Sequence, residues 1–302
     1  MEPVIRINNV SKKFGTQCAL QHINLNIKPG EIYGLIGRNG AGKTTLLKLI
    51  TKLIHLNDGS ISLFGSQSER EWEQNLKHVG CVLESPVAHQ HLSAYDNLRY
   101  YCIVYGIQNA GQVINETLAY VGLSDTGNKP FRSFSLGMKQ RLGIAIAILT
   151  KPDLLILDEP INGLDPVGII QFRQMIERLN EETNMTIIIS SHILTELYQV
   201  ATKFGILEQG RLIKEITKAD FETLNDQYIV LKTTQLALAS QVLTAQLNLQ
   251  LKVVNQSNEL HIFAAADQIQ TIIQALTQEN IVIDEIYYEK ESLEAYFTSL
   301  IN

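Results

Sequence analysis

The chain has 302 residues, of which 45% are hydrophobic and 19% charged, as expected of a globular protein. Its net charge is −6. The longest apolar run, GIAIAILT at 143–150, is far shorter than the roughly 20 residues that span a bilayer, and no signal-peptide pattern opens the sequence. From Lys218 onward 4 lysines stand against 11 acidic residues, which disfavours nucleic acid and anionic lipid as partners. Three widely spaced cysteines without a CxxC indicate reduced thiols in the cytoplasm.

The first predicted elements are strands that alternate with helices, the pattern of an α/β fold. Residues 4–10 and 23–27 alternate apolar and polar side chains, so we expect antiparallel strands with one wet face. Residues 31–37, 153–159 and 186–191 are almost wholly apolar before polar ends. Such runs predict central parallel strands that are covered on both faces.

The middle of the chain has a different character. From about residue 85 to 150 the apolar spacing is helical, as in YDNLRYYCIVYG, which predicts a helical subdomain inserted into the α/β core. After a strand at 210–216 we expect a polar linker at 217–226. The sequence thus predicts a first domain at 1–216 and a C-terminal accessory domain at 227–302.

The accessory domain has its own series of predicted elements. QYIVLKT reads as a strand, LALASQVLTAQL as a helix, and LQLKVV and ELHIFAA as two further strands. A helix at DQIQTIIQALTQE, a strand at IVIDEIYY and a last helix at ESLEAYFTSLI follow. The order βαββαβ predicts a small ferredoxin-like α/β domain with one added terminal helix.

A phosphate-binding loop is predicted where GRNGAGKTT follows the strand at 31–37. Glycines let backbone N–H groups turn toward phosphate, Lys43 would reach the β- and γ-phosphates of ATP, and the Thr44 hydroxyl would bind Mg²⁺. The alternative is a glycine-rich turn with a coincidental Lys-Thr pair. The residues expected to bind the nucleotide are Gly37, Arg38, Asn39, Gly40, Ala41, Gly42, Lys43, Thr44 and Thr45.

Two carboxylates end the predicted strand LLILDEP. Because strand ends meet beside the phosphate loop in a parallel sheet, Asp158 is expected to hold Mg²⁺ through water. Glu159 is then placed to polarise the attacking water as a general base. The alternative is an acidic N-cap for the next helix.

A histidine follows the predicted strand TIIISS, so it should lie on the same rim of the sheet. From there His192 could donate a hydrogen bond to the γ-phosphate. A lone histidine is more often structural, but the position at a strand end favours the functional interpretation.

A second anion site is indicated by FSLGMKQR at 134–141. Ser135 and Gly137 open a predicted helix, and the N–H groups of a helix start bind anions. The phosphate loop already supplies one such site for the nucleotide of the same chain. The sequence therefore raises the question of which phosphate the second helix start would bind.

The order GRNGAGKTT, FSLGMKQR, LLILDEP, NGLDP and SSH resembles the ATP-binding cassette of ABC transporters over about residues 4–216. The resemblance implies that two cassettes pair head to tail, so that Ser135 and Gly137 face the ATP held by the partner. It also implies that Asp165, in NGLDP, lies in the loop that links the two sites. Phe14 matches the aromatic residue that stacks on adenine, although alone it reads as a core residue.

Two departures narrow the resemblance. The usual signature reads LSGGQ, whereas this sequence reads FSLGM, with Leu136 and Met138 replacing a glycine and a glutamine. The loop after the strand at 79–83 reads CVLESP, with Glu84 where the family normally has glutamine. Glu84, SLGMKQRLGIA and the extension ending SLEAYF resemble the bacitracin-exporter and lantibiotic-immunity branch, which implies that Glu84 couples the site to the permease. The alternative is an exposed loop acid.

The function expected from this resemblance is a Mg-ATP-hydrolysing subunit of an exporter of peptide antibiotics. It would be cytoplasmic, dimeric with ATP, and docked on transmembrane permease subunits at the inner face of the membrane. One alternative is a soluble ABC ATPase acting on ribosomes or DNA, but such proteins usually carry two cassettes or a coiled coil. Another is a module that uses ATP only as a clamp, which Glu159 argues against.

Overall fold

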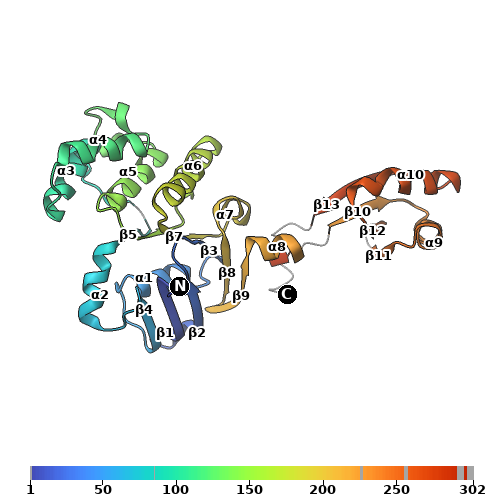
Figure 1. The fold of residues 1–302 in the computed structure, drawn as a ribbon, viewed down its shortest axis with the longest axis horizontal. Helices are drawn as coiled ribbons and strands as arrows, with labels where there is room; N and C mark the ends of the chain where they lie inside the picture. The colour runs from blue at the N-terminus through green and yellow to red at the C-terminus, as the bar shows by residue number, and fades with distance from the viewer. Residues whose placement is uncertain (1, 85, 225–226, 255–257, 291–295, 298–302) are drawn as a thin grey trace. The chain divides into compact units, whose positions relative to one another are not determined.

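The computed structural model of the chain describes residues 2–84, 86–224, 227–254, 258–290 and 296–297 (Figure 1). The chain divides into two compact units, unit 1 at residues 1–218 and unit 2 at residues 219–300. Within the described ranges, no helix is both long enough and apolar enough to cross a bilayer.

A six-stranded sheet forms the centre of unit 1, in the order β5-β6-β7-β3-β8-β9. Neighbouring strands are parallel except for the pair β8 and β9. Every residue of β3, β6 and β7 is buried, which confirms the prediction of central parallel strands. The strands are β3 (Ile32–Ile36), β5 (Val79–Val82), β6 (Leu154–Asp158), β7 (Thr186–Ser191), β8 (Lys203–Glu208) and β9 (Arg211–Thr217).

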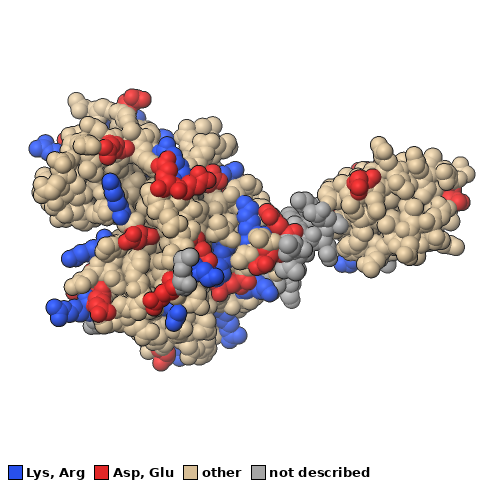
Figure 2. All heavy atoms as spheres, in the orientation of Figure 1, with Lys and Arg blue, Asp and Glu red and all other residues tan. Residues whose placement is uncertain are grey.

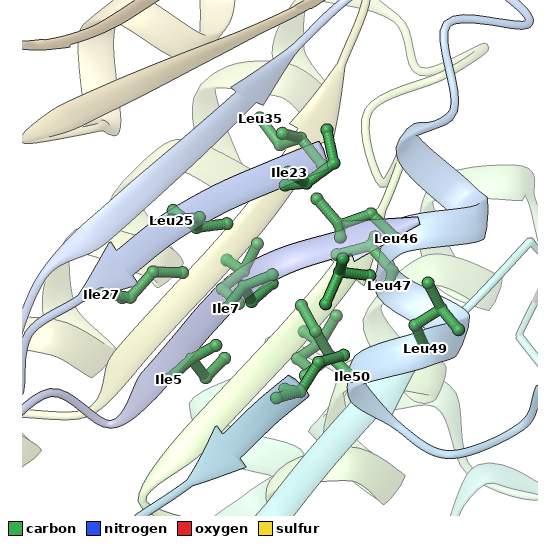
Figure 3. Close-up of a cluster of buried hydrophobic side chains, with 14 of the residues drawn as sticks. Ile5, Ile7, Ile23, Leu25, Ile27, Leu35, Leu46, Leu47, Leu49 and Ile50 are labelled. Carbon is green, nitrogen blue, oxygen red and sulfur yellow. The ribbon is translucent and has the colours of Figure 1, made fainter. Parts of the chain in front are cut away.

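A second, antiparallel sheet packs over one helix of unit 1. Its strands are β1 (Ile5–Phe14), β2 (Gln17–Ile27) and β4 (Asp58–Leu63), in the order β2-β1-β4. Alternating isoleucines and leucines of β1 and β2 point toward α1 (Lys43–Ile50), whose leucines complete a core that includes Leu35 of β3 (Figure 3). This packing fixes the helix that begins at the phosphate loop. The sequence did not predict β4 or β8.

The helical subdomain lies at one end of unit 1 (Figure 1). Among the described residues between 86 and 150 every regular element is helical, as predicted. Side-chain oxygens of Ser93, Ser135 and Asp165 cap the helix starts of α3, α5 and α6. The remaining helices of unit 1 are α2 (Glu69–Asn75), α3 (Ala94–Tyr105), α4 (Ala110–Tyr120), α5 (Leu136–Ile148), α6 (Pro166–Thr183) and α7 (Leu194–Val200).

Unit 2 has the predicted order βαββαβ. Its antiparallel sheet runs β11-β12-β10-β13, and two helices cover one face through a core that includes Ile229, Leu243, Leu260 and Ile272. This confirms the ferredoxin-like fold. The elements are α8 (Lys218–Leu224), β10 (Gln227–Lys232), α9 (Leu236–Leu247), β11 (Gln250–Val254), β12 (Glu259–Phe263), α10 (Ile269–Gln278) and β13 (Glu285–Lys290).

Two sequence predictions concern the ends of unit 2. The segment 217–226, expected to be a polar linker, contains the helix α8, whose sequence KADFETL is rich in good helix formers. The terminal helix expected at 291–301 lies outside the described residues except for residues 296–297, which are helical.

The division into two units generates a first prediction. A chain ending at Lys218 should fold and bind ATP, because it keeps both sheets and α1 with their cores. Circular dichroism with thermal unfolding and an ATP titration would test this. A fragment that shows no cooperative unfolding would mean that unit 1 depends on unit 2.

Candidate functional site

The phosphate loop connects β3 to α1, and two of its glycines, Gly40 and Gly42, have positive φ. Gly42, the N-cap of α1, has φ of +109°, and a Cβ built on it would lie 2.7 Å from Leu20 Cδ2. Only glycine fits there. α1 therefore begins directly after this glycine, and the N–H groups of its first turn with the helix dipole would stabilise a phosphate bound there.

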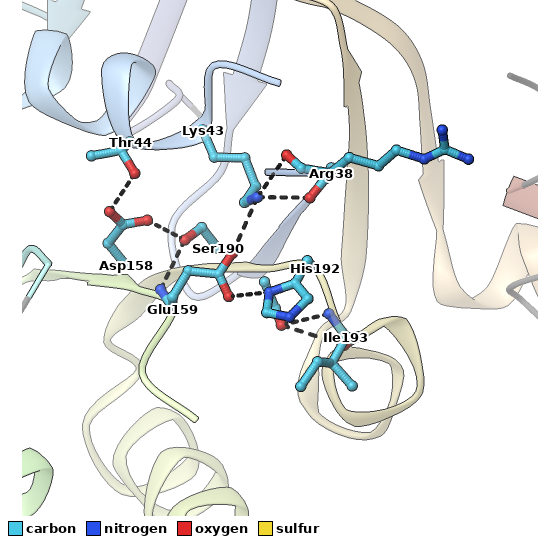
Figure 4. Close-up of polar contacts among 10 residues, drawn as sticks. Arg38, Lys43, Thr44, Asp158, Glu159, Ser190, His192 and Ile193 are labelled. Carbon is cyan, nitrogen blue, oxygen red and sulfur yellow. Dashed lines mark hydrogen bonds and ion pairs between the residues drawn. The ribbon is translucent and has the colours of Figure 1, made fainter. Parts of the chain in front are cut away.

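Lys43 lies folded over its own loop. Its side chain is buried, and Nζ donates to the carbonyl oxygens of Gly37 at 2.7 Å and Arg38 at 3.2 Å. The same ammonium forms an ion pair with Glu159 Oε1 at 3.1 Å (Figure 4). Lys43, which the sequence predicts to bind the phosphates of ATP, is thus paired with Glu159, which the sequence predicts to polarise the attacking water.

Asp158, the last residue of β6, connects the start of α1 with β7. Thr44 Oγ1 donates to Asp158 Oδ2 at 2.6 Å, and Ser190 Oγ, from β7, donates to Asp158 Oδ1 at 2.5 Å. Asp158 is only 4% exposed, so these hydrogen bonds compensate a nearly buried carboxylate. The Thr44 hydroxyl and the Asp158 carboxylate, which the sequence predicts to bind Mg²⁺, therefore lie side by side.

Glu159 follows in a conformation rare for residues other than glycine, with φ of +49°. Ser190 holds this turn, because the Glu159 N–H donates to both its Oγ at 3.0 Å and its carbonyl oxygen at 3.1 Å. His192 Nδ1 lies 2.9 Å from Glu159 Oε2. The structure therefore brings Lys43, Glu159 and His192 together at one rim, each carboxylate oxygen facing one nitrogen.

A cavity of about 600 Å³ opens in front of this cluster. Phe14 lies at its wall with 51% of its surface exposed, and Lys12 Nζ lies 4.9 Å from the ring centre. An exposed aromatic ring beside a phosphate loop offers a flat surface for a base. Gly37, Arg38 and Ala41, which the sequence also predicts to bind the nucleotide, are not among the residues that line this cavity. The cavity is lined by Phe14, Gln17, Cys18, Ala19, Gln21, Asn39, Gly40, Gly42, Lys43, Thr44, Thr45, Glu159, Gln209 and Gly210.

The residues of the second anion site lie around a separate cavity of about 310 Å³. Ser135 Oγ accepts from the Met138 N–H at 3.3 Å, so the hydroxyl caps α5. Asp165 Oδ1 accepts from the Gly168 N–H at 2.9 Å and caps α6 in the same way. Ser135, Gly137 and Asp165 are thus brought together with one another.

Glu84 lies on the loop between β5 and the helical subdomain. Its carboxylate forms an ion pair with Lys48 Nζ of α1 at 2.5 Å, although the side chain is 64% exposed. The Tyr101 hydroxyl donates to the Val87 carbonyl at 3.3 Å, which ties the same loop to α3. The loop therefore touches both the helix of the phosphate loop and the helical subdomain.

Sequence reasoning missed Ser190 and two cavity-lining residues beside the phosphate loop, where the Gly210 N–H donates to the Ala41 carbonyl at 3.0 Å. Ser190 precedes the histidine in IIISSHIL, and a polar residue at the end of a buried strand was the signal that could have identified it. Gln209 and Gly210 belong to the β8–β9 turn, whose position depends on the sheet order. No local pattern marks them.

A phosphate loop, an acidic strand end and a histidine on one rim of a parallel sheet define a P-loop nucleotide hydrolase. Known proteins make the class more specific. The sequence profile of the ABC transporter family matches residues 20–162. The ABC transporter ATP-binding protein YcbN of Bacillus subtilis is 40% identical over 100% of this chain and 98% of its own.

Two further relatives carry a named transport role. The bacitracin transport ATP-binding protein BcrA of Enterococcus faecalis is 36% identical over 100% of this chain and 97% of its own. The lantibiotic transport ATP-binding protein SrtF of Streptococcus pyogenes is 42% identical over 74% of this chain and 96% of its own. The chain belongs to the ABC transporter ATP-binding family, whose members hydrolyse ATP to drive transport.

The geometry of Lys43 generates a second prediction. Lys43→Ala should weaken ATP binding by more than about tenfold, because it removes a buried positive charge from the phosphate loop. Lys48→Ala is a matched control on the same helix, where the lysine points to Glu84 instead. Titration of both variants with fluorescent ATP checks this. Equal losses would show that α1 was disturbed as a whole.

Proposed function

We propose that the chain is the Mg-ATP-hydrolysing subunit of an exporter that removes peptide antibiotics from the cell. One observation carries the catalytic part: Glu159 lies at the rim of the phosphate loop between Lys43 and His192, with contacts of 3.1 Å and 2.9 Å. ATP in the cavity would draw Lys43 to its phosphates. Glu159 would then be free to accept a proton from the attacking water, and His192 to donate to the γ-phosphate.

The residues at the proposed metal position fit Mg²⁺. This ion prefers oxygen ligands and keeps several waters, and the Thr44 hydroxyl and Asp158 carboxylate already meet 2.6 Å apart. Thr44 and Asp158 would hold the ion, Asp158 through water. When bound, Mg²⁺ would neutralise charge on the β- and γ-phosphates.

A head-to-tail dimer is part of the proposal. The N–H groups of the first turn of α5, capped by Ser135, open onto a surface cavity separate from the nucleotide cavity of the same chain. A second cassette would therefore supply Ser135 and Gly137 to close each ATP site. Asp165 beside them would link the two sites.

The permease would dock on an exposed apolar face of α3. Tyr100, Ile103, Val104 and Tyr105 are between 44% and 73% exposed, and Val87 on the adjoining loop is 75% exposed. Such a patch on a monomer indicates a protein partner. On the face in Figure 2, basic and acidic side chains are interspersed over unit 1 without a broad basic field, which supports a protein rather than nucleic acid. The subunit would thus work at the inner face of the membrane.

The proposal that the cargo is a peptide antibiotic rests on the names of two relatives. BcrA carries bacitracin transport in its name and matches this chain over its full length, unit 2 included. SrtF, named for lantibiotic transport, matches 74% of the chain. A full-length match favours a bacitracin-like cyclic peptide over a lantibiotic. Bacitracin and nisin sensitivity of a strain lacking the subunit would test the choice.

Glu159→Gln is the variant that tests the catalytic assignment. It should keep ATP affinity within a few-fold while lowering hydrolysis by about 10² or more, because the amide cannot accept the proton of water. The stalled chain should elute as a dimer with ATP. Phosphate release and gel filtration measure both effects. Hydrolysis near the parent rate would remove Glu159 from the role of base.

Glu84→Gln tests the coupling loop. The exposed ion pair with Lys48 contributes at most about 1 kcal/mol, so folding and ATP affinity should stay within a few-fold of the parent. Permease-dependent resistance should fall, because the neutral amide loses the ion pair with Lys48 and holds α1 less firmly to the loop that contacts α3. Lys48→Ala should lower resistance equally. Unchanged resistance would exclude the coupling role, and loss of ATP binding would make Glu84 a site ligand.

A further inference from the structure

A leucine at the start of α5 packs against the loop that leads from Glu159 to Asp165. Leu136 is the first residue of α5, directly after its cap Ser135. A Cβ built on Gly163 would lie 2.8 Å from Leu136 Cδ2, so a methyl group of Leu136 fills the space above that glycine. Any larger residue at position 163 would collide with it.

The contact is reciprocal. A Cβ built on Gly137 would lie 3.6 Å from Leu164 Cδ2, which is ordinary van der Waals distance. Leu136 of the helix start thus packs over Gly163 of the loop, and Leu164 of the loop packs over Gly137 of the helix start. Further along the two helices, Arg141 Nη1 donates to Gln171 Oε1 at 3.3 Å, so α5 and α6 are joined again beside the same cavity.

The loop itself is compact between its two functional ends. The Asn162 N–H donates to the Glu159 carbonyl at 3.2 Å, and the Leu164 N–H donates to the Ile161 carbonyl at 3.1 Å. Two successive turns therefore separate Glu159 from the Leu136 contact. A shift of the loop at Gly163 would therefore be expected to reach Glu159, whose φ of +49° already depends on its surroundings.

We propose that Leu136 is a positioning residue for Glu159: it holds the loop 160–165 against the start of α5 so that the carboxylate stays aligned with the phosphate loop. The inference deepens the proposed function and rests on Glu159 being the base. Leu136 acts through the loop, and 45% of its surface remains exposed. Leu136, which replaces a glycine of the usual signature, would thus position a catalytic residue of its own subunit.

Two substitutions in the full-length chain separate this role from others. Leu136→Ala removes the methyl groups over Gly163 but keeps the helix start and its N–H groups. Leu136→Met keeps a flexible apolar chain of similar volume, so it should retain the contact. Both variants are measured by steady-state hydrolysis of ATP and by amide hydrogen exchange of residues 161–164.

For Leu136→Ala we expect kcat to fall about tenfold or more, since misplacement of a catalytic group by about 1 Å costs up to 10²-fold. The KM for ATP should stay within about threefold, because binding contacts are kept. Exchange at 161–164 should become faster as the loop loosens. Leu136→Met should restore kcat and slow exchange.

Three results would overturn the proposal. The first is unchanged exchange at 161–164 in Leu136→Ala, which does not depend on hydrolysis and so stays informative if the proposed function fails. The second is a parent-like kcat in that variant. The third is loss of the ATP-dependent dimer in Leu136→Ala combined with Glu159→Gln, which would make Leu136 an intersubunit contact. A parent chain without ATPase activity would instead contradict the proposed function.

Discussion

The structure of the site depends on the adjacency of β6, β7 and β3 in one parallel sheet. Their carboxyl ends meet at the same edge, so Glu159 after β6, His192 after β7 and the phosphate loop after β3 become neighbours although they lie far apart in sequence. Hydrogen bonds at this edge then fix the details. Beyond the backbone pairing of β6 with β7, the Ser190 hydroxyl donates to Asp158 and accepts from the Glu159 N–H.

The same adjacency of strand ends explains why the charged side chains of the site are partners of one another in the structure without ATP. Buried polar and charged side chains need hydrogen-bond or ion-pair partners, and each of these residues has one. Lys43 pairs with Glu159, and Asp158 receives hydroxyls from Thr44 and Ser190. In the proposed mechanism, binding of ATP would exchange the contact of Lys43 with Glu159 for contacts with phosphate. Glu159 would then be released to act on the attacking water.

The sequence predicted the parts of the fold that have local signatures. Uniformly apolar runs marked β3, β6 and β7, and the helix 236–247 coincides with α9. β4 was missed because DGSISL is short and only half buried, and β8 was missed although it is mostly buried. The predicted Lys43, Asp158, Glu159 and His192 lie together at one rim of the sheet. Gln209 and Gly210 were not predicted, since their proximity to the phosphate loop arises from strand order, and the polar strand end that marks Ser190 was overlooked. The contact of Leu136 with Gly163 likewise joins segments that no spacing relates.

The central claim is that each complete ATP site combines the phosphate loop of one chain with the start of α5 of another. Mixing two impaired variants tests it most directly: Lys43→Ala removes the positive charge of the phosphate loop, and Gly137→Asp places an acidic side chain at the second anion site. If the account holds, the mixture regains up to about a quarter of the parent hydrolysis rate, because half of randomly formed dimers are mixed and each carries one intact site. A mixture as inactive as its components would contradict the account.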